Sequence, residues 1–387
     1  MRRPNPIWLG LGVVGWAGLA FLAVTMFNAS PRTAGFDLEL LLEAGRALAA
    51  GQSPYDPSLI AGTTPGATDL FYSYPPPVAQ AMSLVAAVPS GAMFGALWIA
   101  AIAGLVASTR RIEVRLTVPI LALAPLYLPF AIALVFGNLD AIFPFAYGLV
   151  LVAALSTERV PRIAGGVALA LATVAKVHPG SLGLWFVGRA IRERLGGRPP
   201  RAALVVAAAA VTGLAVLVAS LAAGGTELWR DYVPVAGAAS GARLLDARNA
   251  GPAAQLALAL GGDEALVRTI HLAVAAVALV ATLGAALVIR DSLTSLAVAA
   301  VASLVVLPVT WYHYPVALIP FAVAAVARSR GTIAAATTLR LVAAALIVAT
   351  LAIAWLPALW IAVGLGLAAV ARSAPGEPNT ETATEPA

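Results

Sequence analysis

The chain has no cysteine among its 387 residues, which excludes a disulfide framework and any reaction at a thiol. Charged residues are also scarce, at 11% of the chain, against about 25% in typical soluble domains. The three histidines are isolated and lack the spacing of metal ligands. We therefore expect neither a metal nor any other cofactor.

Apolar residues are abundant instead, at 61% of the chain with a mean hydropathy of +0.91. Many of them form runs close to the roughly 20 residues that cross a bilayer as a helix. The sequence predicts an all-α polytopic membrane protein with about 11 or 12 transmembrane helices. The expected spans are approximately 7–28, 78–107 (a short broken helix and then a span), 116–136, 139–155, 162–177, 179–190, 201–222, 266–289, 293–311, 313–327, 336–355 and 357–371.

The first apolar run, 7–27, exceeds the roughly 7–15 residues of a signal-peptide core, so it is expected to remain as an uncleaved helix. With a cytoplasmic N-terminus, 17 of the 24 Lys and Arg residues fall on the cytoplasmic side of the cell membrane. This asymmetry accounts for the sequence pI near 10.0 without a nucleic-acid partner.

The same topology places two long segments outside, 29–75 and 223–265. Connectors between spans are usually short, so long ones generally carry a function. The residues up to 372 would form one transmembrane domain. The polar, Pro-rich stretch 373–387 is expected to be a disordered cytoplasmic tail.

The first external segment begins with an amphipathic stretch, FDLELLLEAG, at 36–45. At 100° per residue, Glu39 and Glu43 share one face of a helix, whereas Asp37 aligns with Leu41 and Ala44 on the apolar face. A carboxylate on that face suits a catalytic base in a partly desolvated groove, where its pKa would rise. The alternative is that Asp37 merely caps the helix N-terminus.

The rest of that segment contains AGQSPYDP at 50–57 and FYSYPPPV at 71–78. Their prolines exclude a helix and favour an extended, turn-rich loop. Tyr55 and Tyr74 are candidate substrate-binding residues there. The alternative is that these tyrosines anchor the loop at the membrane interface.

Three further polar clusters fall at external ends of the expected spans: GNLD at 137–140, KVHP at 176–179 and TWYHYP at 310–315. Each has an ordinary explanation, namely a turn with a helix cap, a snorkelling lysine and an aromatic belt. Their common side instead indicates one site, because ionisable residues that converge on one membrane face suggest function. The candidate substrate-binding residues are Asn138, Asp140, Lys176, His178 and His313, together with Arg248 of the second external segment.

A carboxylate with nearby cations suits group transfer from a phosphorylated donor, since the base takes a hydroxyl proton and the cations stabilise the departing phosphate. Two other classes stay open: a transporter or flippase of lipid-linked sugars, and a catalytically silent scaffold. Transporter sites lie near the middle of interrupted spans, whereas the charges here gather at span ends.

The order of these motifs resembles the actinobacterial polyprenyl-phosphate-mannose-dependent α-mannosyltransferases, glycosyltransferase family 87 of the GT-C type. The resemblance rests on Asp37, GQSPYD (51–56), YPPP (74–77), GNLD (137–140), AKVHP (175–179) and PVTWYHY (308–314). The chain departs from the family at 137–140, usually Gly-Gln-x-Asn, and at Leu307-Pro308, usually Ser-Pro.

The resemblance implies a membrane glycosyltransferase with Asp37 as its base and its active site on the extracytoplasmic side. The implied donor is a polyprenyl-phosphate sugar, most often mannose, from which the sugar is transferred with inversion to form an α linkage. The implied acceptor is a lipid-linked or cell-envelope glycan.

Overall fold

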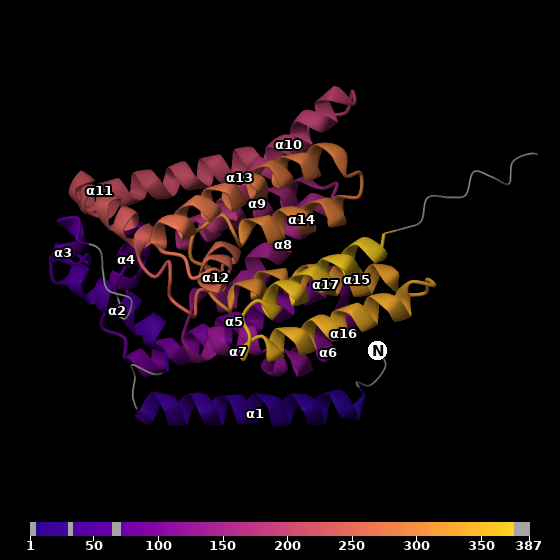
Figure 1. Ribbon diagram of the computed structural model, residues 1–387, viewed down its shortest axis with the longest axis horizontal. Coiled ribbons are helices and arrows are strands. Elements are labelled where there is room, and N and C mark those ends of the chain that lie inside the picture. Colours follow the sequence, from indigo (N-terminus) through magenta and orange to yellow (C-terminus); the bar gives the residue numbers. More distant parts are fainter. Residues whose placement is uncertain (1–4, 30–33, 64–70, 375–387) are drawn as a thin grey trace, which may run out of the picture.

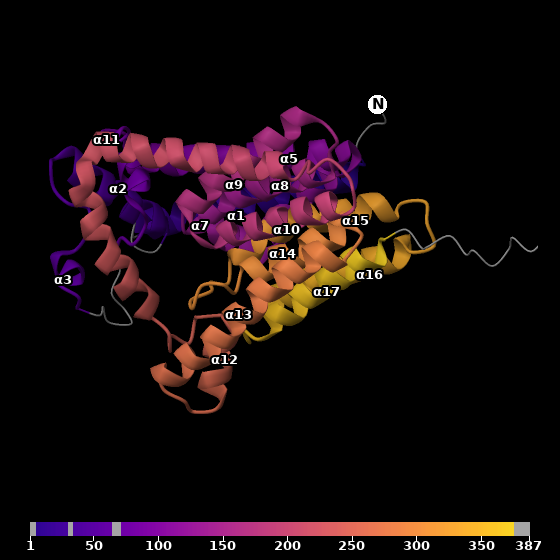
Figure 2. The same cartoon turned by 90° about the horizontal axis from the view of Figure 1, so that it is seen from above.

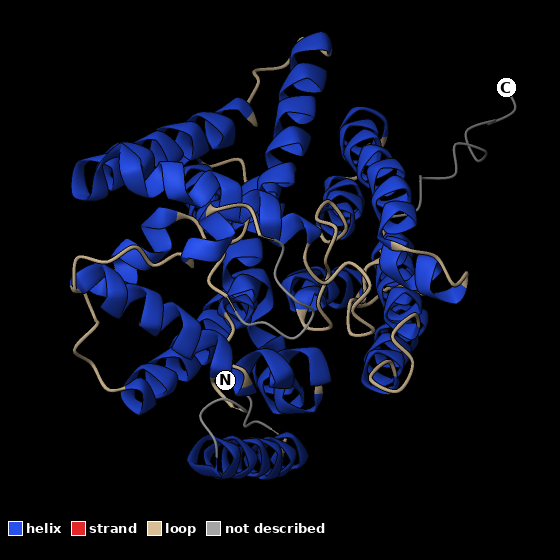
Figure 3. Ribbon diagram, turned by 60° about the vertical axis from the view of Figure 1, so that its left-hand side comes forward, coloured by secondary structure: helices blue, strands red, loops and turns tan. Residues whose placement is uncertain are grey.

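Every regular element in the described part of the chain is a helix, and Figure 3 shows blue helices and tan loops with no red strand. The computed structural model describes residues 5–29, 34–63 and 71–374. Four helical stretches within these ranges are long and apolar enough to cross a bilayer. The predicted class of all-α polytopic membrane protein is confirmed. Apart from Ser373 and Ala374, the expected tail lies outside the described residues.

The four long stretches run along the longest axis of the molecule (Figure 1). They are α1 (Pro6–Ala29), the run Ser90–Leu126, which contains α5 (Ser90–Glu113) and α6 (Thr117–Leu123), most of α11 (Ala203–Gly241), and α13 (Glu264–Val288). Shorter apolar helices lie beside them: α8 (Phe143–Leu155), α14 (Ser292–Ser303), α15 (Ile319–Ser329), α16 (Ala335–Leu351) and α17 (Ala358–Arg372). The remaining α-helices are α2 (Phe36–Ala49), α3 (Pro57–Ile60), α4 (Pro76–Ser83), α7 (Leu128–Val135), α9 (Arg159–Ala175), α10 (Leu182–Leu195) and α12 (Pro252–Ala259).

The largest buried cluster lies between α8, α9, α10 and α14. Trp185 of α10 is 1% exposed, and its indole N–H donates to Ser295 Oγ of α14 at 2.8 Å. Gly166 of α9 lets α11 approach closely, because a Cβ atom at this position would lie 2.5 Å from Val205 O. Small residues commonly allow such close packing between membrane helices. The helices of this cluster lead directly to the site, since α9 ends at Ala175, one residue before Lys176.

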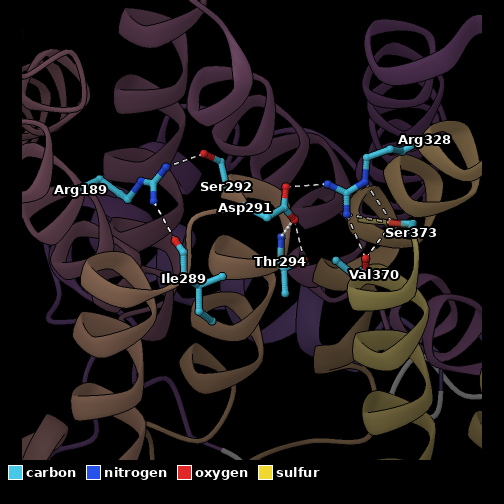
Figure 4. Close-up of polar contacts among 8 residues, drawn as sticks. All are labelled: Arg189, Ile289, Asp291, Ser292, Thr294, Arg328, Val370 and Ser373. Atoms are coloured by element: carbon cyan, nitrogen blue, oxygen red, sulfur yellow. Dashed lines mark hydrogen bonds and ion pairs between the residues drawn. The ribbon is translucent and has the colours of Figure 1, made fainter. Parts of the chain in front are cut away.

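A polar cluster joins α10, α15 and α17 to the turn between α13 and α14, at an end of the molecule that is rich in arginine (Figure 4). Arg189 of α10 donates to Ile289 O and Ser292 Oγ, at the turn between α13 and α14. Arg328 of α15 pairs with Asp291 at 2.7 Å and also donates to Val370 O and Ser373 Oγ beside α17. These contacts fix the end of the bundle opposite α2, α3 and α12 (Figure 1).

Proline interrupts the helix in three of the expected spans. The expected break within 78–107 is confirmed, because α4 ends at Ser83 and α5 begins at Ser90. The expectation that proline excludes a helix from 50–57 and 71–78 is wrong at the end of each stretch, because α3 begins at Pro57 and α4 at Pro76, and the first turn of a helix tolerates proline. The expected span 116–136 is divided into α6 and α7 by a 3-10 turn and an extended residue, Tyr127, next to Pro125 and Pro129. The expected span 293–311 is too long, since α14 ends at Ser303 and a non-helical stretch leads through Pro308 to the site.

The second segment predicted to be external, 223–265, is mostly helical. Gly225, with φ 67°, interrupts α11, and the remainder of this helix turns sharply across the end of the bundle that holds α2 and α3 (Figure 2). A left-handed φ of this kind favours glycine. The turned part carries Asp231, whose carboxylate accepts a hydrogen bond from Ser53 Oγ at 2.8 Å. The two segments predicted to be external therefore contact each other.

The predicted sidedness can be tested with single cysteines, because the native chain contains none. Ser58 and Glu227 are exposed in the two external segments, and Arg198 is exposed near the arginine-rich end. We expect Ser58→Cys and Glu227→Cys to react with a membrane-impermeant maleimide in intact cells. Arg198→Cys should react only after permeabilisation. The reverse pattern would invert the topology and place the site in the cytoplasm.

Candidate active site

Helix α2 lies at the end of the bundle away from the arginine-rich end, with its apolar face inward. Leu41 and Ala44 are buried, whereas Glu43 is exposed, as the helical periodicity predicts. The helix is preceded by Gly35, and no side chain caps it. Asp37 lies within the first turn, and its carboxylate accepts a hydrogen bond from Asn138 Nδ2 at 2.6 Å. The alternative of a helix-capping aspartate is therefore wrong.

The start of α2 is docked on the end of α7 by backbone contacts. The N–H groups of Gly35 and Asp37 donate to the carbonyls of Val135 and Phe136 at 2.8 and 3.0 Å. Gly137 permits this approach because its φ is 69° and a Cβ atom there would lie 2.7 Å from Leu38 Cβ. The glycine thus sets the position of Asp37 beside the next residue, Asn138.

Asn138 joins Asp37 to a buried charge cluster. Its Oδ1 atom accepts from the backbone N–H of Asp140 at 2.9 Å and from Lys176 Nζ at 3.2 Å. Asp140 is 1% exposed, and its Oδ2 atom lies 2.8 Å from Lys176 Nζ and 3.1 Å from His313 Nε2. Asn138, not Asp140, caps the short helix at 139–142. The structure therefore brings five predicted site residues together from four separate segments.

Lys176 is the only lysine in the sequence. It follows α9 in an extended conformation, and its side chain is 9% exposed. An ammonium group has three N–H donors. Nζ contacts Asn138 and Asp140 and lies 4.6 Å from the ring centroid of Tyr314, so all three donors face groups of the protein. The snorkelling alternative is wrong, since this lysine points into the site.

The environment of Asp37 raises the pKa of its carboxyl above the ordinary 3.8. The largest cause is burial, because removal from water disfavours the charged form. The nearby His313 and Lys176 and the hydrogen bond from Asn138 act in the opposite direction and favour the carboxylate. Asp37 therefore has the desolvation expected of a general base and the partners needed to orient it.

A cavity of about 1280 Å³ opens at this cluster. Asp37, Asn138, Lys176 and His313 line its polar part, together with Tyr74. Another part of its wall is apolar and comes from α7 and from the turn between α16 and α17. That part contains Ile132, Phe136, Ile353, Trp355 and Leu356. The cavity therefore offers a polar site continuous with a surface suited to a hydrocarbon chain.

Three predicted site residues, Tyr55, His178 and Arg248, lie outside the cluster that joins Asp37 to Lys176 and His313. Tyr55 is 2% exposed and does not line the cavity; its hydroxyl donates to Tyr74 O at 2.9 Å and so supports the loop behind Tyr74. His178 is 1% exposed and packs between Phe143 and Tyr314, and within the described chain neither of its ring nitrogens has a hydrogen-bond partner. Arg248 lines the cavity and is paired with Asp246 at 2.7 Å.

The sequence analysis did not identify two residues of the second external segment. Arg243 lines the cavity, and its guanidinium lies 5.6 Å from the ring centroid of Trp311. Asn249 is fully buried and connects the loop after α11 to the stretch before Trp311. Its place on the predicted external side, against the positive-inside bias, was the signal available for Arg243. Asn249 had no such signal.

A family model described as glycosyltransferase family 87 matches residues 72–310, which is more than half of the chain. The chain belongs to glycosyltransferase family 87. The matched part contains Asn138, Asp140 and Lys176, whereas Asp37 lies well before its start and His313 shortly after its end. No curated protein and no solved structure matched this family 87 member.

Proposed function

We propose that this family 87 glycosyltransferase transfers a sugar from a polyprenyl-phosphate donor to a hydroxyl group of a lipid-linked or cell-envelope glycan. The observation that carries the proposal is the position of Asp37. Its carboxylate faces a large cavity at the end of the bundle, is held by Asn138 and lies beside cationic side chains. A glycosyltransferase that uses an inverting mechanism needs such a base for the acceptor hydroxyl.

The shape of the cavity supports a lipid-linked donor. Its apolar wall at α7 and the α16–α17 turn suits a prenyl chain, and its polar part suits a sugar phosphate. Trp355 in that turn is 60% exposed, as is common for aromatic residues at a membrane interface. A donor that stays in the bilayer would reach the site without crossing open water.

The chemistry follows from these positions. Asp37 takes the proton of the acceptor hydroxyl while the acceptor oxygen attacks the anomeric carbon from the face opposite the phosphate. The bond between that carbon and the phosphate oxygen breaks, and its electron pair stays on the phosphate. Inversion at a β-linked donor gives an α linkage. Mannose is the sugar that the motif resemblance favours, and the external side of the cell membrane is the side that the charge asymmetry favours.

The role of Asp37 predicts a severe loss of transfer in Asp37→Asn. Asparagine keeps the size of the side chain but does not accept the proton, so transfer should slow at least about a hundredfold. The purified variant is assayed with a radiolabelled polyprenyl-phosphate sugar and a membrane-lipid acceptor. Binding of the lipid donor and thermal stability should stay close to those of the wild type.

Glu43→Gln is the matched control, because Glu43 is exposed on the opposite face of the same helix. It should retain normal turnover. Normal turnover in Asp37→Asn, with loss of turnover in Asp140→Asn instead, would show that Asp37 is structural and that the base was assigned to the wrong carboxylate.

The pH dependence of transfer should reveal the raised pKa of Asp37. The base acts as a carboxylate, so kcat/KM should fall as the pH drops through that pKa, with a midpoint above 3.8. Asn138→Ala removes a hydrogen bond that favours the carboxylate, so the midpoint should move further upward. Enzyme returned to neutral pH should recover, which separates titration from unfolding. A midpoint below 3.8 would contradict the assignment.

The side chains of Lys176 and His313 near Asp37 predict a third effect. Lys176→Ala or His313→Ala should lower turnover by a factor on the order of ten to a thousand, because Lys176 supplies positive charge near the departing phosphate and His313 contacts the same Asp140 carboxylate as Lys176. Arg268→Ala, which alters an exposed external arginine 3.9 Å from Glu264, serves as the control. Full activity in both the Lys176 and the His313 variant would show that these residues contribute only to packing.

A further inference from the structure

Arg243 is held on the cavity wall by aromatic rings. Its guanidinium carbon lies 5.9 Å from the ring centroid of Phe71 and 5.6 Å from that of Trp311. A guanidinium group can stack on aromatic faces and still present a planar fork of donors to a phosphate. Phe71 and Trp311 line the same cavity, so the planar guanidinium of Arg243 is held at the cavity wall.

The backbone at Arg243 is in an uncommon conformation. With φ 60°, it is the one non-glycine residue in the described chain with a positive φ. Such a conformation has an energetic cost for a residue with a side chain and is often found at functional sites. Here it occurs immediately after α11, at the point where the chain turns into the cavity wall.

Asn249 fixes the loop that carries Arg243. Its Nδ2 atom lies 3.3 Å from Leu244 O and 3.1 Å from Pro308 O, and its Oδ1 atom accepts from the N–H groups of Gly251 and Thr310. The N–H of Ala250 also donates to Thr310 O at 2.8 Å. Because Thr310 directly precedes Trp311, these bonds place the Arg243 loop in a fixed relation to Trp311 and His313.

The charge cluster beside Asp37 does not exclude a role for a further cation at the phosphate. Lys176 directs its three donors at Asn138, Asp140 and Tyr314, and its charge is shared with the Asp140 carboxylate. His313 also faces that carboxylate. A phosphate that departs from the sugar gains negative charge, and it is best stabilised by a donor already in place. Arg243 is a preorganised group of that kind on the same cavity.

On the basis of the proposed function, we propose that Arg243 binds the phosphate of the polyprenyl donor and stabilises it as the leaving group. When the bond between the anomeric carbon and the phosphate oxygen breaks, the phosphodiester monoanion becomes a monoester dianion. The guanidinium meets the added charge, while the acceptor proton goes to Asp37. Arg243 is thus a catalytic residue, and Asn249 is a positioning residue that holds its loop.

A binding experiment separates this proposal from the rest of the reaction. Purified protein in lipid nanodiscs is titrated with farnesyl phosphate and with farnesol, which has the same chain without the phosphate. The variants are Arg243→Ala, Arg243→Gln and Arg243→Lys, with Arg230→Ala as the control. Arg230 is exposed on α11 and does not line the cavity.

We expect Arg243→Ala and Arg243→Gln to weaken farnesyl phosphate binding about ten- to a hundredfold, the scale of one or two charge-assisted hydrogen bonds. Farnesol affinity should not change. Lysine keeps the charge but loses the planar fork and the stacking, so Arg243→Lys should bind with intermediate affinity. In the transfer assay, kcat should fall more than the affinity for the donor, because the phosphate gains charge at the transition state.

Asn249→Ala tests the positioning role. It should weaken farnesyl phosphate binding in the wild-type background and cause no further loss when combined with Arg243→Ala, because both changes act through the same guanidinium. Independent losses that add in the double variant would contradict this role.

The outcomes distinguish two kinds of failure. If wild-type protein prefers farnesyl phosphate to farnesol and the Arg243 variants keep that preference, the assignment of Arg243 is wrong and the proposed donor stands. If wild-type protein does not discriminate between the two lipids, the proposed donor fails as well. Should Arg243→Ala not fold, Arg243→Gln and Arg243→Lys carry the same test with larger side chains.

Discussion

The candidate site depends on one primary amide, that of Asn138. Its Nδ2 atom donates to the Asp37 carboxylate, while its Oδ1 atom accepts from Lys176. An amide can serve an anion on one side and a cation on the other because it contains both a donor and an acceptor. An aspartate at this position would repel Asp37. A leucine would leave both Asp37 and Lys176 without this hydrogen-bond partner. The connection between α2 and Lys176 therefore depends on an amide side chain at position 138.

The hydrogen bonds of Asn138 also stabilise the buried charged side chains beside one another. Charges removed from water are costly unless they are paired and hydrogen-bonded. Lys176 and Asp140 form such a pair at 2.8 Å, and Asn138 connects this pair to the half-buried Asp37. The cluster lies at the end of the bundle, where the cavity admits water and substrate to one side. The Asp37 carboxylate can stay in this low-water environment because Asn138 donates a hydrogen bond to it and Lys176 lies nearby.

The sequence was sufficient to predict residues whose signal is local or depends on topology. Helical periodicity placed Asp37 inward, and the common side of three span ends brought together Asn138, Lys176 and His313. It was not sufficient where the outcome depends on contacts between distant segments. Tyr55 and His178 have the residue types of a site, yet they pack behind it. Asn249 was missed because its function depends on backbone groups about 60 residues away, at 308–310.

The segment matched by the family model explains how the site is assembled from parts. It contains Gly137 and Asn138, which contact the start of α2, and Arg243 and Asn249 of the loop after α11. Asp37 lies outside the match, on a helix whose position is set by backbone bonds to Val135 and Phe136. The matched segment thus forms the surface on which α2 packs, and α2 supplies the Asp37 carboxylate. Because Gly137 permits close contact with Leu38, a side chain at 137 would displace the carboxylate from Asn138 without altering any charged group of the site.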